Sequence, residues 1–356
     1  MAKDMHTQEW DSATLTKLDV FEQYVHDWFN ITSSYGQNEK FNALEIYDLF
    51  CGSGYDGTGK YKGSPLRILD AILKRNPKGK TIKLYFNDNN EEKIKTLKEI
   101  INNEYKILSD RKDIKIKYTS VDTDVYTLYS QKYFKLVFLD QYGIKHIHKA
   151  QEFLTKGTDI LIFIASSYIK RFLEEKTFKK YLDVNSISKR DFENKSNYET
   201  HRIITQYFKT IFKNHFIAPF SLTKDNGNTN GLIFISTHRK GQEQFLKTAW
   251  KIDENFGEGN KNIDRDFTKD ETSLFYEPNE PSEKERRYAE LLKEFLKEQR
   301  SNIEIKYFSL DNGFLSRHTN KILNSLKNHL ECEYCNNAKR GFHLDRDEVK
   351  VKVRLK

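Results

Sequence analysis

The stretch Tyr47-Asp48-Leu49-Phe50-Cys51-Gly52-Ser53-Gly54 decides the fold of this 356-residue chain. It continues the apolar run that begins at Ala43, and such a run is typical of a buried strand. Two glycines separated by one residue permit positive φ angles and allow the backbone to approach a ligand closely. We therefore expect a strand that ends in a glycine-rich turn at the edge of a sheet.

Other apolar runs repeat this pattern along the chain. They cover residues 81–86, 114–118, 135–139, 159–164 and 231–237. Amphipathic helical patterns lie between several of these runs, for example from Leu66 to Lys74. Strands that alternate with helices predict a mostly parallel sheet covered on both faces. The expected fold class is α/β, with a Rossmann-like doubly wound sheet.

Aspartates follow four of the predicted strands, namely Asp48, Asp88, Asp122 and Asp140. Ligands bind at the carboxyl ends of the strands in open α/β sheets, so we expect these side chains around one site. Asp88 is placed to accept hydrogen bonds from both hydroxyls of a ribose. Asp122 is placed to meet an adenine amino group. Aspartate is also common at strand ends and helix caps, so each residue alone could be structural.

Together these positions predict a site for S-adenosylmethionine in a sheet of the methyltransferase type. The expected cofactor-binding residues are Asp48, Phe50, Gly52, Gly54, Ser64, Asp88 and Asp122. Ser64 is expected to cap a helix whose first residue is Pro65. The N-terminus of that helix would help to hold the methionine carboxylate. Another adenosine cofactor remains an alternative.

The candidate reaction site is Asp140-Gln141-Tyr142-Gly143. Amino methyltransferases use a short strand-end motif of an acidic or amide residue, prolines and an aromatic. Its oxygens accept hydrogen bonds from the target amine and orient the nitrogen lone pair, and its aromatic ring stacks on a flipped base. We therefore predict Asp140 and Tyr142 as catalytic residues. A role for Asp140 as a further ligand or cap residue is the alternative.

The charge and cysteine content limit the class of protein. The formal net charge is +8, and residues 281–356 carry 17 Lys or Arg against 12 Asp or Glu, which permits contact with nucleic acid. No run of apolar residues is long enough to cross a membrane, and the N-terminus lacks the apolar stretch of a secretory signal. Three cysteines argue against a disulfide scaffold. We expect a cytoplasmic protein.

A metal site is not predicted. Cys332-x-x-Cys335, with His329 before it and His343 after it, has a spacing that zinc could use. However, this stretch lies across a predicted helix end and hairpin, and the chain contains no second Cys-x-x-Cys.

Three regions are expected along the chain: a Rossmann domain with an N-terminal helix (1–253), a polar linker (254–280) and a tail domain (281–356). The tail shows three helical patterns and then a hairpin, which predicts a winged helix-turn-helix-like domain. Residues on the outer face of its third helix suit the major groove of DNA. They are Arg317, His318, Asn320, Lys321, Asn324 and Lys327. Contact with a protein instead of DNA is an equal alternative.

Three motifs resemble those of the three-Cys-motif partner family of bacteria and their mobile elements. They are the Tyr47–Gly54 loop, Gly63-Ser64-Pro65-Leu66 and the Phe138–Gly143 element, and Lys251-Ile252-Asp253 is also similar. The resemblance covers roughly Lys17 to Asp253. It implies a methyltransferase-like Rossmann fold and a partner protein that bears the three cysteines. The sequence departs from the family motifs at Cys51, Ser53 and Gln141.

These patterns lead to a functional hypothesis. The chain is predicted to be an S-adenosylmethionine-dependent methyltransferase-like protein that acts on or with nucleic acid and works with a three-Cys-motif partner protein. The alternative is a non-catalytic adaptor that keeps the fold and binds DNA or a partner protein through its tail.

Overall fold

The structure, a computed structural model, describes residues 9–35, 42–129, 133–141, 143–176, 178–181, 186–335 and 340–356. The chain divides into two compact units, Met1–Thr248 and Ala249–Lys356.

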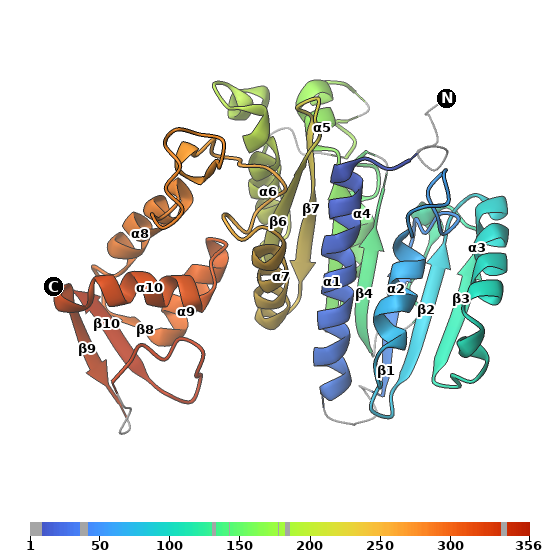
Figure 1. Ribbon diagram of the computed structural model, residues 1–356, viewed down its shortest axis with the longest axis horizontal. Helices are drawn as coiled ribbons and strands as arrows, with labels where there is room; N and C mark the ends of the chain where they lie inside the picture. Colours follow the sequence, from blue (N-terminus) through green and yellow to red (C-terminus); the bar gives the residue numbers. More distant parts are fainter. Residues whose placement is uncertain are drawn as a thin grey trace. The chain divides into compact units, whose positions relative to one another are not determined.

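The described residues of the first unit build a seven-stranded sheet (Figure 1). Its strands are β1 (Ala43–Asp48), β2 (Thr81–Asn87), β3 (Ile114–Thr119), β4 (Phe134–Leu139), β5 (Thr158–Ile164), β6 (Phe216–Thr223) and β7 (Thr229–Ser236). Their spatial order is β3-β2-β1-β4-β5-β7-β6, and β7 runs antiparallel to both of its neighbours. The chain order reverses between β1 and β4, which is the switch point of a doubly wound sheet. The predicted Rossmann-like α/β fold is confirmed.

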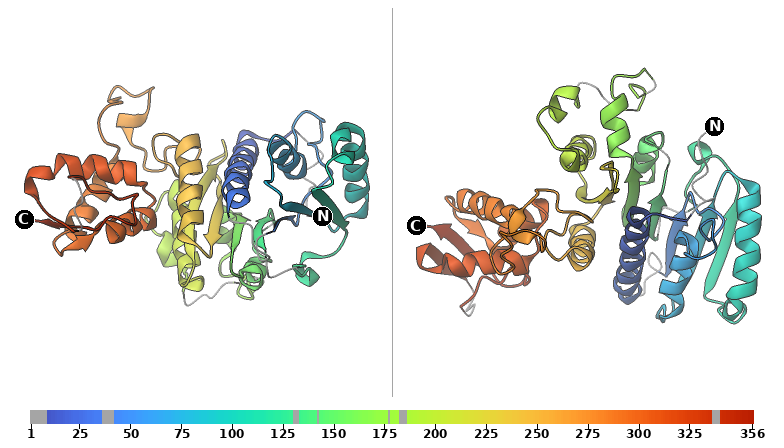
Figure 2. Two further views of the ribbon diagram at one scale, coloured as in Figure 1. Left: turned by 90° about the horizontal axis from the view of Figure 1, so that it is seen from below. Right: turned by 45° about the horizontal axis from the view of Figure 1, so that its top comes forward.

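Helices cover both faces of this sheet, as Figures 1 and 2 show. One face carries α1 (Ser12–Ser34), α2 (Ser64–Leu73), α3 (Glu91–Glu104) and α7 (Arg239–Ile252), and the other carries α4 (Ile147–Phe153), α5 (Ser166–Phe172) and α6 (Thr200–Ile211). Aromatic pairs join α1 and α7 to the strands: Phe21 stacks on Phe138 at 4.1 Å, and Phe245 stacks on Phe234 at 4.7 Å. Among the described residues, no helix combines the length and the apolar character that crossing a membrane requires.

The sequence pattern did not predict β6. This strand contains Pro219 and lies at the edge of the sheet, where it pairs only with β7. An edge strand tolerates a proline because one side of its backbone has no hydrogen-bonding neighbour. Because of this proline, the sequence pattern did not indicate a strand, although the sheet edge accepts one here.

The second unit combines three helices with a small sheet. Its elements are α8 (Glu283–Phe295), β8 (Arg300–Ser301), α9 (Asn302–Asp311), α10 (Ser316–Ser325), β9 (Leu330–Tyr334) and β10 (Val351–Leu355). The strands pair antiparallel in the order β8-β10-β9. Capping boxes at Ser282 and Ser301 begin α8 and α9. The unit has its own apolar core, to which Leu292, Ile305 and Leu323 contribute.

The first part of residues 254–280, expected as a linker, is packed into the second unit, whereas most of residues 271–280 are exposed. Phe256 and Ile263 are buried, and Asp266 accepts a hydrogen bond from the Glu283 N–H at 2.6 Å. Lys284 Nζ lies 3.0 Å from Glu258 Oε2. The missing periodicity of this stretch therefore reflects an irregular but packed loop, and the boundary between the units falls at Thr248 and Ala249.

Candidate functional site

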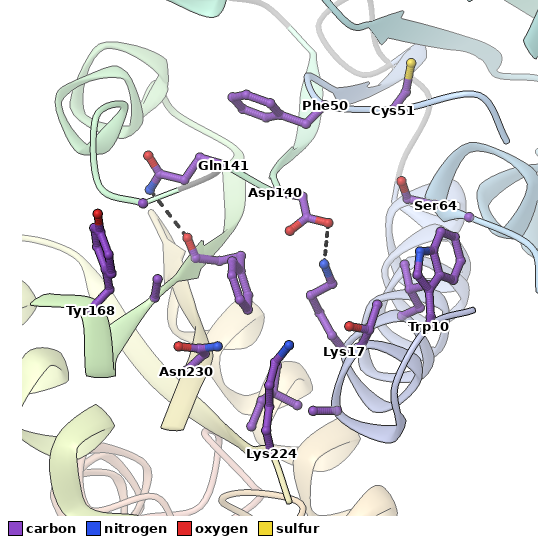
Figure 3. Close-up of a pocket in the computed structure, with 18 of the residues that line it drawn as sticks. Trp10, Lys17, Phe50, Cys51, Ser64, Asp140, Gln141, Tyr168, Lys224 and Asn230 are labelled. Carbon is purple, nitrogen blue, oxygen red and sulfur yellow. Dashed lines mark hydrogen bonds and ion pairs between the residues drawn. The ribbon is translucent and has the colours of Figure 1, made fainter. Parts of the chain in front are cut away.

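A cavity of about 850 Å³ opens at the carboxyl ends of the central strands. Its lining includes the glycine loop after β1, Asp88 after β2, Asp140 after β4 and Phe163 in β5. The first turns of α1 and α5 and the β6–β7 hairpin complete the wall. Figure 3 shows Phe50, Asp140, Lys17 and Tyr168, among others, around a common space. This is the position at which doubly wound sheets bind ligands.

Hydrogen bonds donated by two backbone N–H groups, one to a side chain and one to the backbone, hold the glycine loop in shape. Gly52 and Gly54 have φ angles of 63° and 102°, which favour glycine. The Gly52 N–H donates to Asp88 Oδ2 at 3.1 Å, and the Gly63 N–H donates to the Gly54 carbonyl at 2.7 Å. A Cβ atom on Gly54 would lie 3.1 Å from Leu97 Cδ1. Both the conformation and the packing therefore require glycine at position 54.

Asp88 organises this loop and also lines the cavity. Besides Gly52, its carboxylate binds the start of α3, because Oδ1 accepts a hydrogen bond from the Asn90 N–H at 2.9 Å. The residue is 8% exposed. Each carboxylate oxygen can accept a second hydrogen bond, so Asp88 can hold the loop and bind a ligand hydroxyl at once.

Asp48 lies behind the cavity lining. It is fully buried, and within the described residues its Oδ2 atom has no hydrogen-bond partner. Burial raises the pKa of this carboxyl to about 7, against the effect of the nearby Ser64 hydroxyl. The negative charges of Asp140 and Asp88 raise this pKa further. A cationic group placed beside this carboxyl would favour its ionised form.

Ser64 lines the cavity, but it does not cap α2. The helix begins at Ser64, and its N-cap is Gly63, which makes no side-chain cap. A Cβ atom at Gly63 would lie 3.1 Å from the Gly54 carbonyl oxygen and 3.3 Å from Trp10 Cη2. These close contacts leave no room for a side chain at position 63. The N-cap is therefore Gly63, one residue earlier than expected, and Pro65 is the second helical residue.

The structure brings Phe50 to the cavity but not Asp122. Phe50 lines the wall, whereas Asp122 is exposed and absent from the lining. The Asp122 carboxylate instead caps the short helix Thr123–Val125 through the Asp124 N–H at 2.8 Å. Its Oδ2 lies 3.7 Å from Lys145 Nζ. The capping alternative thus describes the contacts of Asp122, and an adenine contact remains a prediction.

Asp140 pairs with a residue that the sequence did not reveal. Lys17 of α1 forms an ion pair with Asp140 Oδ2, and its Nζ lies 4.8 Å from the centre of the Phe163 ring. The side chain of Lys17 is 9% exposed. The sequence offered one indication of this pair: Lys17 lies on the otherwise apolar, buried face of an amphipathic helix. Within the described residues, Asp140 Oδ1 has no hydrogen-bond partner.

Gln141 has a structural function. It is 1% exposed. Its Oε1 accepts a hydrogen bond from the His146 N–H at 2.8 Å, and its Nε2 donates to the Phe163 carbonyl at 3.4 Å. These bonds hold the loop after β4 against β5. Tyr142, the second predicted catalytic residue, lies outside the described residues.

In the second unit, most of the predicted nucleic-acid-binding residues are accessible. Arg317, Lys321, Asn324 and Lys327 are exposed, and Asn320 is half-buried. His318 was predicted to face outward and instead packs inward: its ring lies 4.0 Å from the Trp250 ring, and its Nδ1 accepts the Leu315 N–H at 3.2 Å. Burial lowers the pKa of His318 to about 4, and the charges of neighbouring cations lower it further.

Across the described parts of both units, no three His, Cys, Asp or Glu side chains come together in a group that could hold a metal ion.

The sequence matches no protein-family model, and no curated protein matches it. Solved structures do match. Trm1 from Pyrococcus horikoshii in complex with S-adenosyl-L-methionine is 11% identical, with a TM-score of 0.37, over 67% of this chain and 59% of that chain.

Two further solved structures also match. A putative S-adenosyl-L-methionine-dependent methyltransferase from Methanococcus maripaludis is 13% identical, with a TM-score of 0.30, over 63% of this chain and 89% of that chain. The N-terminal domain of human METTL16 in complex with SAH is 11% identical, with a TM-score of 0.32, over 62% and 70% of the two chains. Similarities this distant carry no argument about the function of this chain.

Proposed function

We propose that the first unit is an S-adenosylmethionine-dependent methyltransferase. The observation that carries this proposal is the gathering of three strand-end carboxylates at the switch point of the sheet. Asp88 and Asp140 line the cavity, and Asp48 lies behind its lining. S-adenosylmethionine carries a sulfonium and an ammonium group, which carboxylates attract. A dinucleotide would bring a pyrophosphate, which they repel. The seven-strand order with a reversed β7 is also that of methyltransferase sheets.

The residues around the cavity fit such a cofactor. The backbone at Gly52 and Gly54 would lie against the cofactor, and Asp88 would accept hydrogen bonds from the ribose. The N-terminus of α2, with the Ser64 hydroxyl, would hold the methionine carboxylate. The unpaired Asp48 Oδ2 would favour the positive charge on the methionine portion.

When bound, the cofactor would supply an activated methyl group. Asp140 Oδ1 would accept a hydrogen bond from the acceptor amine and orient its lone pair. Lys17 fixes Asp140 through its other oxygen, so the acceptor meets a carboxylate of defined orientation. From its place beside Asp140 in the sequence, Tyr142 would stack on the acceptor.

The second unit would contact nucleic acid or a partner. The order α8-β8-α9-α10-β9-β10, with β8 and β9 on either side of β10, supports a winged-helix-like domain. The exposed Arg317, Lys321 and Lys327 support phosphate contacts through α10. Cooperation with a three-Cys-motif partner protein rests on the motif resemblance alone.

The test is a calorimetric titration of the full chain with S-adenosylmethionine and with S-adenosylhomocysteine. We expect one-to-one binding of both compounds, with dissociation constants of roughly 1–100 μM. Folding is checked by circular dichroism. If folded protein binds neither compound, the cofactor proposal is rejected and the adaptor hypothesis takes its place.

A further inference from the structure

We propose that the cavity contains a nucleobase site that selects an exocyclic amine in single-stranded nucleic acid. This acceptor pocket comprises Asp140, Tyr168, Arg171, Lys224, Asn228 and Asn230, all of which line the cavity. The inference rests on the proposed methyltransferase function and names the class of its acceptor.

The acceptor pocket is separate from the glycine loop. Figure 3 shows the Lys17–Asp140 pair between two groups of side chains, with Phe50 and Ser64 on one side and Tyr168 and Asn230 on the other. The volume of about 850 Å³ is in the upper part of the usual range for small-molecule sites. The cavity therefore has room for a second ligand beside a cofactor.

Two asparagines offer hydrogen bonds to the edge of a base. Asn230 is the second residue of β7, and Asn228 immediately precedes the strand. Both line the cavity. Both are half-buried, and neither side-chain amide has a hydrogen-bond partner within the described part of the chain. A primary amide both donates and accepts, which matches the polar edge of a base.

The backbone around these asparagines is fixed on both sides. Ser167 Oγ accepts a hydrogen bond from the Thr229 N–H at 2.7 Å, which ties β7 to the start of α5. On the other side, the His201 ring packs against Gly231, where a Cβ atom would lie 2.3 Å from His201 Nε2. His201 is itself held by Ser166 Oγ at 2.7 Å. The amide of Asn230 is therefore presented from a rigid strand.

The remaining residues fit the other parts of a nucleotide. The Tyr168 ring packs on Phe172 at 4.4 Å and is still 48% exposed, so it offers a surface for base stacking. Arg171 is exposed beside it. Lys224 lies on the β6–β7 hairpin, and its Nζ is 2.7 Å from Asp11 Oδ2. These two cations suit the phosphates on either side of a flipped base.

The selection of an amine follows from the acceptors that face the pocket. Asp140 Oδ1 has no partner among the described residues, while Lys17 occupies Oδ2. An exocyclic amine has two hydrogens, one for Asp140 Oδ1 and one for the Asn230 carbonyl. A base with an oxo group at this position would leave Asp140 Oδ1 unpaired and place a second acceptor against it, whereas the Asn230 amide can turn and donate. Asp140 would therefore be the residue that rejects the oxo group.

The test measures binding of fluorescein-labelled, single-stranded homopolymers to the full chain loaded with S-adenosylhomocysteine. Deoxyadenosine is compared with deoxyinosine, and deoxycytidine with deoxyuridine, since within each pair an oxo group replaces the amine and the adjacent ring nitrogen gains a hydrogen. In at least one pair, we expect the amine-bearing strand to bind at least about tenfold more tightly. Equal affinities within both pairs, or no binding of any strand, would overturn the proposal.

The variant Asp140→Asn, whose amide can donate to an oxo group, should reduce the amine preference to about twofold or less while S-adenosylhomocysteine still binds. The control is Asn324→Ala in α10, which should change the affinity for all four strands by the same factor and keep the preference. An Asp140→Asn protein with the full preference would contradict the inference. Loss of cofactor binding by the unmodified protein would instead reject the proposed function.

Discussion

The two sides of the cavity are built in different ways. The glycine-loop side comes from one short segment, residues 48–64, together with Asp88, and backbone hydrogen bonds such as Gly63 N–H to the Gly54 carbonyl hold it. The acceptor side comes from α1, β4, α5 and the β6–β7 hairpin, and side chains join these elements, as in the Lys17–Asp140 pair. The glycine-loop side tolerates few substitutions, because its shape depends on backbone conformation. The residues of the acceptor side can differ with the acceptor, because side chains join its elements.

The comparison predicts the largest effect at Asp88, the residue that holds the glycine loop. Asp88→Ala removes the partner of the Gly52 N–H and of the Asn90 N–H, and with them the proposed ribose contact. We expect S-adenosylmethionine to bind about a hundredfold more weakly by calorimetry, which corresponds to about 3 kcal/mol. The matched control is Asp191→Ala, since that carboxylate is exposed, caps a short helix and lies outside the cavity lining. We expect it to change the affinity less than about threefold, because an exposed cap contributes little to a site that it does not line. Equal losses of affinity in the two variants would show that Asp88 makes no specific contribution to cofactor binding.

A pair of glycines tests the same contrast in stability. Gly54 and Gly143 both have positive φ angles, 102° and 89°. A Cβ atom on Gly54 would meet Leu97 Cδ1 at 3.1 Å, whereas a Cβ atom on Gly143 would meet nothing within 4 Å. Gly54→Ala should lower the free energy of unfolding by about 3 kcal/mol through strain and overpacking. Gly143→Ala should lower it by about 1 kcal/mol through strain alone. Urea denaturation measures both, and a larger loss at Gly143 would contradict the contrast.

The smallest effect concerns pH and Asp48. The pKa of Asp48 is raised to about 7 in the folded chain. Between the ordinary pKa of aspartate and about pH 7, this carboxyl therefore binds a proton only in the folded state. As the pH rises through that range, Asp48 makes the folded state less stable. A cation bound near this carboxyl favours its ionised form. The affinity for S-adenosylmethionine should therefore rise about tenfold from about pH 6 to about pH 8.

Asp48→Asn is the control for this pH dependence, because an amide of the same shape does not titrate. Its affinity should vary less than about threefold over the same range, the remainder coming from the amino group of the ligand. Calorimetry in buffers of different ionisation enthalpy would count the protons released. An equal slope in both proteins would place the titrating group elsewhere.

The sequence predicted the glycine-loop side better than the acceptor side. Asp48, Gly52, Gly54 and Ser64 are close in the chain, and Asp88 ends the adjacent strand, so the strand and turn patterns were enough to bring them together. Lys17 is 123 residues from Asp140, and no local pattern relates them. For β6, a proline that is acceptable only at a sheet edge concealed the strand.

Two individual residues show why local periodicity is not enough. Helical spacing placed His318 on the outer face of α10, but Trp250 covers that position with its ring. Asp122 followed a strand as the other aspartates do, yet its carboxylate closes a short turn through the Asp124 N–H. In both cases, the position of the side chain depends on a contact that strand and helix patterns do not describe.

Trp10 gives the cavity an optical property of its own. The chain has three tryptophans. Trp28 and Trp250 are each 3% exposed, whereas Trp10 is half-buried and lines the cavity above Gly63. A molecule that enters beside the glycine turns will change the surroundings of this indole and leave those of the other two nearly constant. The tryptophan fluorescence of the unlabelled protein should therefore report whether the cavity is occupied. The Trp10→Phe variant is the control, because it should lose this response.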